Sequence, residues 1–140
     1  MNRRQLLLGT ATGLALPRAW SQGSSGAVVI GYAGVPRIDA TTVMRLYTGR
    51  AIEAGSVTVT VANLAVGHPL RQRFLSAYLQ TDEERYRAYW TVRRHVGKGA
   101  PPRELGSVAE MVDFVTHTPG AVGYVDAAAA GAGINVICRG

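Results

Sequence analysis

The chain has 140 residues, of which 47% are hydrophobic, so it is long enough for one folded domain with its own core. Its formal net charge of +6 comes from 15 basic and 9 acidic residues. Three of the arginines lie in the first 21 residues, and removing that segment leaves +3, scattered without a basic run. This balance gives no reason to propose nucleic acid as a partner, and it is compatible with a small anionic ligand.

Residues 1–21 have the pattern of a removable signal peptide. The Arg3-Arg4 pair precedes an apolar stretch, residues 6–16, that is too short for a lasting membrane anchor. Small residues at positions 19 and 21 predict cleavage after Ser21, and the arginine pair leaves both the Sec and the twin-arginine route open. We therefore expect a periplasmic protein without membrane insertion after cleavage, in which residues 22–26 form a flexible leader.

The next segment predicts a strand, a helix and a second strand. Residues 27–30 are an apolar, β-branched run that is typical of a buried strand. Asp39 has the position of an N-cap before a helix over residues 40–48. The alternation of residues 57–61 predicts a strand with one more polar face.

Two helices with apolar stripes are expected to follow. The first begins at Pro69 and repeats large apolar residues, Phe74 and Tyr78 among them, at helical spacing. Thr81 has the position of a cap before the second, over residues 82–96. Four side chains of the second helix predict an inward stripe, with an aromatic ligand cage as the alternative: Tyr86, Tyr89, Trp90 and Arg93.

The C-terminal part alternates in the same way. Residues 98–106 are expected to be a connection without regular structure, and Ser107 to cap a further helix. Residues 121–125 predict a strand in which Gly123 allows another backbone to come close, and residues 134–138 predict the last strand. The whole order predicts an α/β fold, a single three-layer lobe with a mixed, mainly parallel sheet flanked by helices.

The candidate ligand site is the turn that leads into the helix at Pro69. Ligands of open α/β sheets bind beyond the carboxyl ends of strands, where a helix start offers free N–H groups and a positive dipole end. Because proline has no N–H, the predicted donors are Gly67, His68, Leu70 and Arg71. An arginine in a first helical turn is unfavourable by roughly 0.3–1 kcal/mol unless an anion offsets it. The alternative is that Arg71 faces solvent or pairs with a carboxylate.

Other chemistry-bearing residues form no pattern typical of an active site. His68, His95 and His117 are far apart and lack metal-ligand spacing. A nucleophile elbow, a paired carboxylate and a phosphate loop are also lacking, so we expect no metal, no cofactor, no catalytic residue and no enzymatic function. The single cysteine, Cys138, excludes an intrachain disulfide, and we interpret it as an apolar residue of the last strand, with a reactive or pairing thiol as the alternative.

Several segments together carry a family resemblance: Asn63-Leu64, His68-Pro69-Leu70-Arg71 with Phe74-Leu75, Tyr89-Trp90, Gly97-Lys98-Gly99 with Pro101-Pro102 and Glu104, and Thr118-Pro119-Gly120-Ala121-Val122-Gly123-Tyr124-Val125. In these segments the chain resembles the short, stand-alone relatives of the phosphate ABC transporter substrate-binding proteins. The resemblance covers nearly the whole chain after Ser21, and the segment from Thr118 is its most specific part.

The resemblance implies a type II periplasmic-binding-protein-like lobe over residues 27–140. It also implies a solute-binding role, with a small oxyanion such as phosphate at the Gly67–Arg71 turn. The chain departs from the full-length phosphate binders at Val66-Gly67-His68-Pro69, where they have a hydroxyl-bearing Ser-Gly-Thr type helix start. A chain of this length also has room for only one of their two lobes. A homodimer would supply the second wall, and the alternative function is a periplasmic interaction module that uses the lobe as a scaffold to bind another envelope protein.

Overall fold

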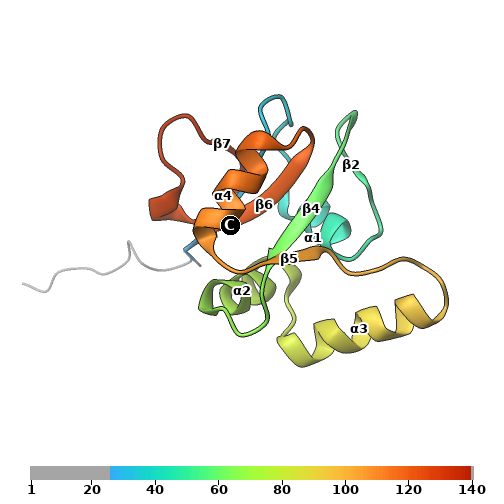
Figure 1. Ribbon diagram of the computed structural model, residues 1–140. Coiled ribbons are helices and arrows are strands. Elements are labelled where there is room, and N and C mark those ends of the chain that lie inside the picture. The colour runs from blue at the N-terminus through green and yellow to red at the C-terminus, as the bar shows by residue number, and fades with distance from the viewer. Residues whose placement is uncertain (1–25, 140) are drawn as a thin grey trace, which may run out of the picture.

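The computed structural model describes residues 26–139, so the predicted signal peptide and nearly all of the leader lie outside the described residues. At its centre is a five-stranded sheet in the order β5-β4-β6-β1-β7 (Figure 1). The strands are β1 (Ala27–Gly31), β4 (Thr60–Leu64), β5 (Arg103–Leu105), β6 (Ala121–Asp126) and β7 (Asn135–Arg139). β4 is parallel to β5 and to β6, whereas β1 is antiparallel to β6 and to β7. Four strands therefore share one direction, which confirms the predicted mixed, mainly parallel sheet.

Helices cover both faces of this sheet, as predicted for a three-layer lobe. α4 (Val108–His117) covers one face (Figure 1). The other face carries α1 (Ala40–Tyr47), α2 (Pro69–Phe74) and the π-helical turn η2 (Leu75–Leu79), which continues α2. Two neighbours in β6 show that these are opposite faces, because successive side chains of a strand point to opposite sides. Gly123 lies against Met111 of α4, whereas Tyr124 stacks on Phe74 of α2.

Gly123 serves a different purpose from the one predicted. A Cβ at this position would collide with the side-chain sulfur of Met111, so the glycine makes room for a side chain of α4 and not for another backbone. On the opposite face, the rings of Tyr47, Phe74 and Tyr124 are completely buried. The Phe74 ring centroid lies 3.9 Å from that of Tyr124 and 4.7 Å from that of Tyr47. The helical stripe and the glycine-containing strand thus share one core.

The predicted strand over residues 57–61 is in fact two strands with different partners. β3 (Val57–Thr58) pairs with β2 (Glu53–Ala54) in a small hairpin, and β4 begins only at Thr60. The predicted unstructured connection over residues 98–106 contains β5, which pairs with the outer edge of β4. Both differences have the same cause, because strand pairing depends on residues distant in sequence that a local pattern does not report.

The helix α3 (Glu83–His95) lies to one side of the sheet (Figure 1). It begins one residue later than predicted, because the Asp82 side chain, and not Thr81, accepts the hydrogen bond from the backbone N–H of Arg85. Its inward stripe is confirmed, since Tyr86 and Trp90 are buried. The tyrosine hydroxyls attach it to the end of α1: Tyr86 Oη donates to the carbonyl of Tyr47, and Tyr89 Oη to that of Thr48, each at 2.7 Å.

The C-terminal end of the chain follows the prediction more closely. The 3₁₀ turn η3 (Ala127–Ala129) leads towards β7, in which Cys138 is half-buried and packs against the core. Burial, helped by the charge of Asp39, raises the pKa of the Cys138 thiol above its usual value, which favours the unreactive protonated form. None of the helices within residues 26–139 combines the length and apolar character that crossing a membrane requires.

Candidate functional site

The predicted anion-binding turn lies where β4 ends and α2 begins. The sequence places a helix start there, and His68 is its N-cap: Nδ1 accepts the backbone N–H of Leu70 at 3.1 Å. The N–H of Arg71 donates to the His68 carbonyl at 3.0 Å, and the N–H of His68 donates to Ala65 at 3.1 Å. Three of the four predicted donors are therefore bonded within the turn itself. Only the N–H of the exposed Gly67, which has a φ of 94°, has no partner among the described residues.

The side chain of Arg71 is buried in a network of carboxylates. Arg71 as a whole is only 3% exposed. Nε and Nη2 donate to the two carboxylate oxygens of Glu83 at 2.7 and 2.8 Å, the bidentate geometry that suits a guanidinium. Nη1 donates to Glu104 Oε2 at 3.0 Å and to the carbonyl of Leu64 at 2.8 Å. This cluster, Arg71 with Glu83 and Glu104, is called the Arg71 network below.

The network explains why a cation is tolerated in the first turn of α2. Burial by itself lowers the pKa of Arg71, but the hydrogen bonds and charges of Glu83 and Glu104 outweigh it, so the pKa is raised and the guanidinium stays charged. Of the alternatives for Arg71, pairing with a carboxylate is therefore the one observed. The offsetting negative charge comes from α3 and β5, whose side chains the local sequence around Arg71 could not reveal. Whether a free anion also binds at this turn stays a prediction.

A second polar cluster fixes the end of β4 beneath the network. Tyr124 Oη donates to Asn63 Oδ1, and the backbone N–H of Leu64 reaches the same oxygen at 2.9 Å. Burial raises the pKa of the Tyr124 hydroxyl well above its usual value and that of Tyr86 to about 12, so both remain protonated donors. Asn63 is 2% exposed, and the local sequence pattern does not single it out as a site residue because it follows the predicted strand over residues 57–61.

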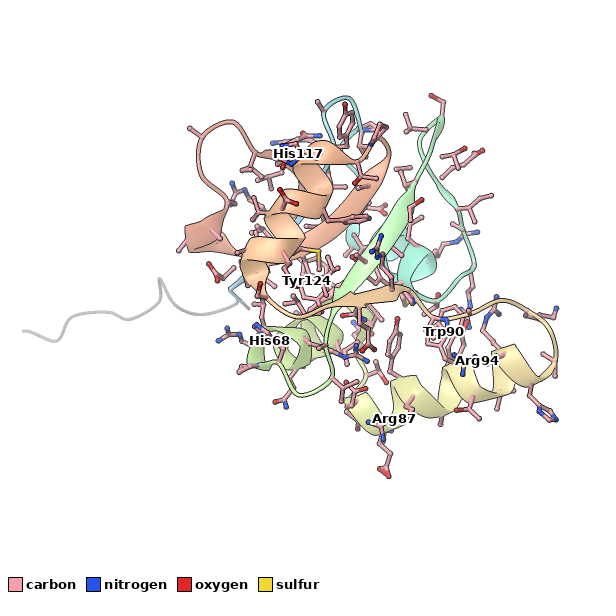
Figure 2. The ribbon with its side chains drawn as sticks, in the orientation of Figure 1. His68, Arg87, Trp90, Arg94, His117 and Tyr124 are labelled. Atoms are coloured by element: carbon pink, nitrogen blue, oxygen red, sulfur yellow. The ribbon has the colours of Figure 1, made fainter. Side chains whose placement is uncertain are left out.

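A groove of about 170 Å³ opens beside the Arg71 network, between α3 and the chain on either side of it. One wall is a face of α3 with Arg87, Trp90, Thr91 and Arg94. The other wall consists of Val66 and the Pro101-Pro102 pair, and the network lines the end between them. Figure 2 shows Arg87, Trp90 and Arg94 along α3, with Trp90 on the side that faces the rest of the molecule. We call this feature the α3 groove.

The remaining sequence candidates lie elsewhere. His117 is at the end of α4, where Nδ1 lies 3.1 Å from an Asp113 carboxylate oxygen, and Figure 2 shows it remote from His68. Within residues 26–139, histidine, cysteine and acidic side chains gather in no group of three that could hold a metal ion. Arg93 stacks on Tyr89 and Trp90, with its Cζ 5.5 and 5.7 Å from the two ring centroids. Arg93 and these two rings therefore pack against one another on α3, and Tyr86 and Trp90 also line the α3 groove.

Comparison with known proteins relates the chain to a solved structure. Neither a protein-family model nor a curated protein matches it. A crystal structure of an ABC-type phosphate transport receptor from Vibrio cholerae matches with a TM-score of 0.61 and 16% sequence identity. The match covers 88% of this chain and 52% of the receptor chain, so the chain spans about half the length of the receptor. At this identity the likeness shows the fold alone: the described residues form an α/β lobe like that of a periplasmic binding protein.

Proposed function

We propose that this chain is an exported binding module that uses a binding-protein lobe to recognise another protein of the cell envelope, and that it does not capture free phosphate. The observation that carries the proposal is the Arg71 network. The one cation that the sequence offered for an anion at the turn is buried and holds two carboxylates. The carboxylates of Glu83 and Glu104 thus occupy the place beside Arg71 where a bound anion was expected.

A free oxyanion at this place would meet unfavourable electrostatics. To reach the guanidinium it would have to displace Glu83, which holds two of the nitrogens, or lie against Glu83 and Glu104. Two or three negative groups around one buried cation repel one another, and a displaced carboxylate would lose its charge-assisted hydrogen bonds. The network therefore opposes anion binding through Arg71.

The shape and composition of the α3 groove favour a macromolecular partner. Small-molecule sites bury most of their ligand, typically in cavities of roughly 300–1,000 Å³, and the α3 groove is smaller and open. Arginine, tryptophan and tyrosine are enriched at the energetically important positions of protein interfaces. Arg87, Trp90 and Arg94 stand together on one wall of the groove.

Two observations favour the second candidate, a solute-binding protein for a small oxyanion. The similar crystal structure is that of a phosphate transport receptor, and the Gly67 N–H has no partner among the described residues. Because the network of one guanidinium and two carboxylates has a net charge of −1, the ion would be held by the Gly67 N–H and not by Arg71. A homodimer would be needed to enclose the ion.

Calorimetry and site-specific cross-linking together decide between the two functions. With phosphate and sulfate at low salt, we expect no saturable heat at millimolar concentration. A photo-reactive residue at Thr91, in the groove, should give one adduct of defined mass in living cells, whereas the same residue at Asp113 on α4 should give none. Saturable phosphate binding without a Thr91 adduct would replace this proposal by the solute-binding function.

Export is part of the proposal and is tested separately. The chain expressed with its own residues 1–21 should appear in the periplasmic fraction with a new N-terminus at Gln22. Replacing Arg3 and Arg4 by lysine should stop export only if the twin-arginine route is used. Intact chains that keep Met1 and remain in the cytoplasm would contradict export.

A further inference from the structure

We infer that the α3 groove binds an acidic, extended segment of the partner protein, with carboxylate side chains that pair with Arg87 and Arg94. The inference rests on the proposed function and names the chemistry of its partner. It is independent of the turn at Gly67, because Arg87 and Arg94 belong to α3 and not to α2.

Basic side chains outnumber carboxylates along α3 and the segment that follows it. Residues 85–103 contain six basic side chains and no carboxylate: Arg85, Arg87, Arg93, Arg94, Lys98 and Arg103. Arg94 makes no ion pair among the described residues, and Arg87 makes only a long one, with 3.8 Å between Nη2 and Glu83. The Arg71 network, in contrast, combines one cation with two carboxylates and has a net charge of −1, so it does not attract an acidic partner. The cationic charge of the groove that is available to a partner is therefore that of Arg87 and Arg94.

The distance between Arg87 and Arg94 along α3 suits an extended segment. Arg87, Thr91 and Arg94 lie at i, i+4 and i+7, which places them on one face of α3. Seven residues of α-helix rise about 10 Å. In an extended segment, side chains on the same face repeat at about 7 Å, and flexible arginine side chains close the remaining difference. An acidic strand can thus present carboxylates to both arginines, whereas one small ion cannot contact both ends of this span.

The volume and lining of the α3 groove suit a single side chain of a partner. At about 170 Å³ it has room for a side chain but is below the usual size of a small-molecule site. Val66, which is 48% exposed, and the Pro101-Pro102 pair offer apolar contact to the stem of that side chain. The wall also contains the buried indole of Trp90.

The test uses a defined peptide against the whole chain. The probe is a hexapeptide of alternating glutamate and alanine with blocked ends, and its control replaces glutamate by glutamine. Binding is followed at low salt by the backbone amide shifts of Val66 and of residues 87–94, and by the indole N–H of Trp90. We expect saturable shifts with the glutamate peptide and none with the glutamine peptide.

Two alanine variants separate the groove from general attraction to a basic helix. Arg94→Ala should weaken binding of the glutamate peptide about tenfold, because it removes a charge-assisted pair. Arg85→Ala removes the same charge from the same helix at a side chain that is 78% exposed and outside the groove, and it should leave the affinity within about twofold. Equal losses in the two variants would overturn the inference.

Three further results would also overturn it. One is no shift with the glutamate peptide, and another is competition of inorganic phosphate for the same amides at millimolar concentration. The third is binding of phosphatidylglycerol vesicles that is lost in Arg94→Ala, which would assign the groove to a membrane surface. The proposed function fails by other results, saturable phosphate binding and no Thr91 adduct. If the Thr91 adduct forms but the glutamate peptide causes no shifts, the proposed function is retained and only the acidic character of the partner is rejected.

Discussion

The sheet core and the helix α3 are held in place by different kinds of contact. The sheet core is mainly apolar, and in its interior the ring of Phe74 stacks on that of Tyr124 and meets that of Tyr47 edge-on. α3 buries only Tyr86 and Trp90, and polar bonds attach the rest of it, from tyrosine hydroxyls to α1 and from Glu83 to Arg71. The fold therefore depends on the core, whereas α3 carries the exposed charge.

This division separates stability from binding. Hydrophobic burial is non-directional and strong, and most of the buried apolar side chains lie outside α3, which contributes Tyr86 and Trp90. Charge-assisted hydrogen bonds are directional, so Glu83 and the tyrosines set the position of α3 relative to the end of β4. Mutations in the two regions should accordingly differ in size and in how far their effects spread.

The largest effect is expected in the core. Phe74→Ala should lower the free energy of unfolding by about 3–5 kcal/mol, because it leaves a cavity among fully buried rings. Denaturant unfolding followed by circular dichroism measures this loss. The matched control is Phe114→Ala on α4, a half-buried ring beneath Arg103, which should cost clearly less. Equal costs would show that the aromatic stack is not the centre of the core.

Breaking the Arg71 network should have the next largest effect. Glu83→Ala leaves a buried guanidinium with Glu104 as its only charged partner, and should cost about 2–3 kcal/mol, less than a fully buried pair because Glu83 is 23% exposed. Hydrogen exchange should show that the loss is concentrated in α3. The neighbouring Glu84→Ala, which removes an exposed carboxylate, should be nearly neutral. A global, even loss of protection would contradict the separation of the two regions.

The contact between α1 and α3 can be tested at a glycine. A Cβ on Gly49 would lie 2.8 Å from Trp90 Cη2, and the φ of 75° is already unfavourable for other residues. Gly49→Ala should cost about 1–3 kcal/mol and shift the indole N–H resonance of Trp90. Gly97→Ala is the control, since Gly97 has a φ of 76° with open space around it. If both variants behave alike, backbone strain and not the Trp90 contact explains the cost.

The smallest expected effect is on the pH dependence of stability, through the cap of α1. The Thr42 N–H donates to Asp39 Oδ1 at 2.8 Å, and this backbone hydrogen bond lowers the pKa of Asp39. Because the folded-state pKa is depressed, the stabilisation is present above the unfolded value of about 3.9 and is lost as pH falls through the lower folded pKa. Melting temperatures from pH 7 downward should decline slightly less for Asp39→Asn than for the unchanged chain. Parallel curves would contradict the cap.

The sequence predicted the parts of the fold that depend on local pattern. The Asp39 and Ser107 caps, the stripe through Phe74 and the strand before Asp126 all follow from neighbours within one or two turns. The predicted strand over residues 57–61 failed because the chain changes partner at Val59, from β2 to β6. Long-range pairing leaves no such local pattern.

The candidate site shows the same limit. The local sequence marked the turn at His68 and the unusual Arg71, and both lie where a ligand site was expected. It did not reveal that Glu83 and Glu104, 12 and 33 residues further along the chain, would pair with that arginine. The α3 groove depends likewise on how α3 lies against Pro101, which follows from tertiary structure alone.

The most direct test of this account is the Nε–H resonance of Arg71 during a titration with inorganic phosphate. With Nε bonded to Glu83 and the side chain buried, we predict that this proton exchanges slowly with water and that its shift is unchanged at millimolar phosphate. The Gly67 amide should also stay in place. In Glu83→Gln, which weakens the internal pair, phosphate should begin to perturb both signals. If phosphate shifts the Arg71 and Gly67 signals of the unchanged chain together and saturably, the lobe binds a free oxyanion at this turn, and the central claim is wrong.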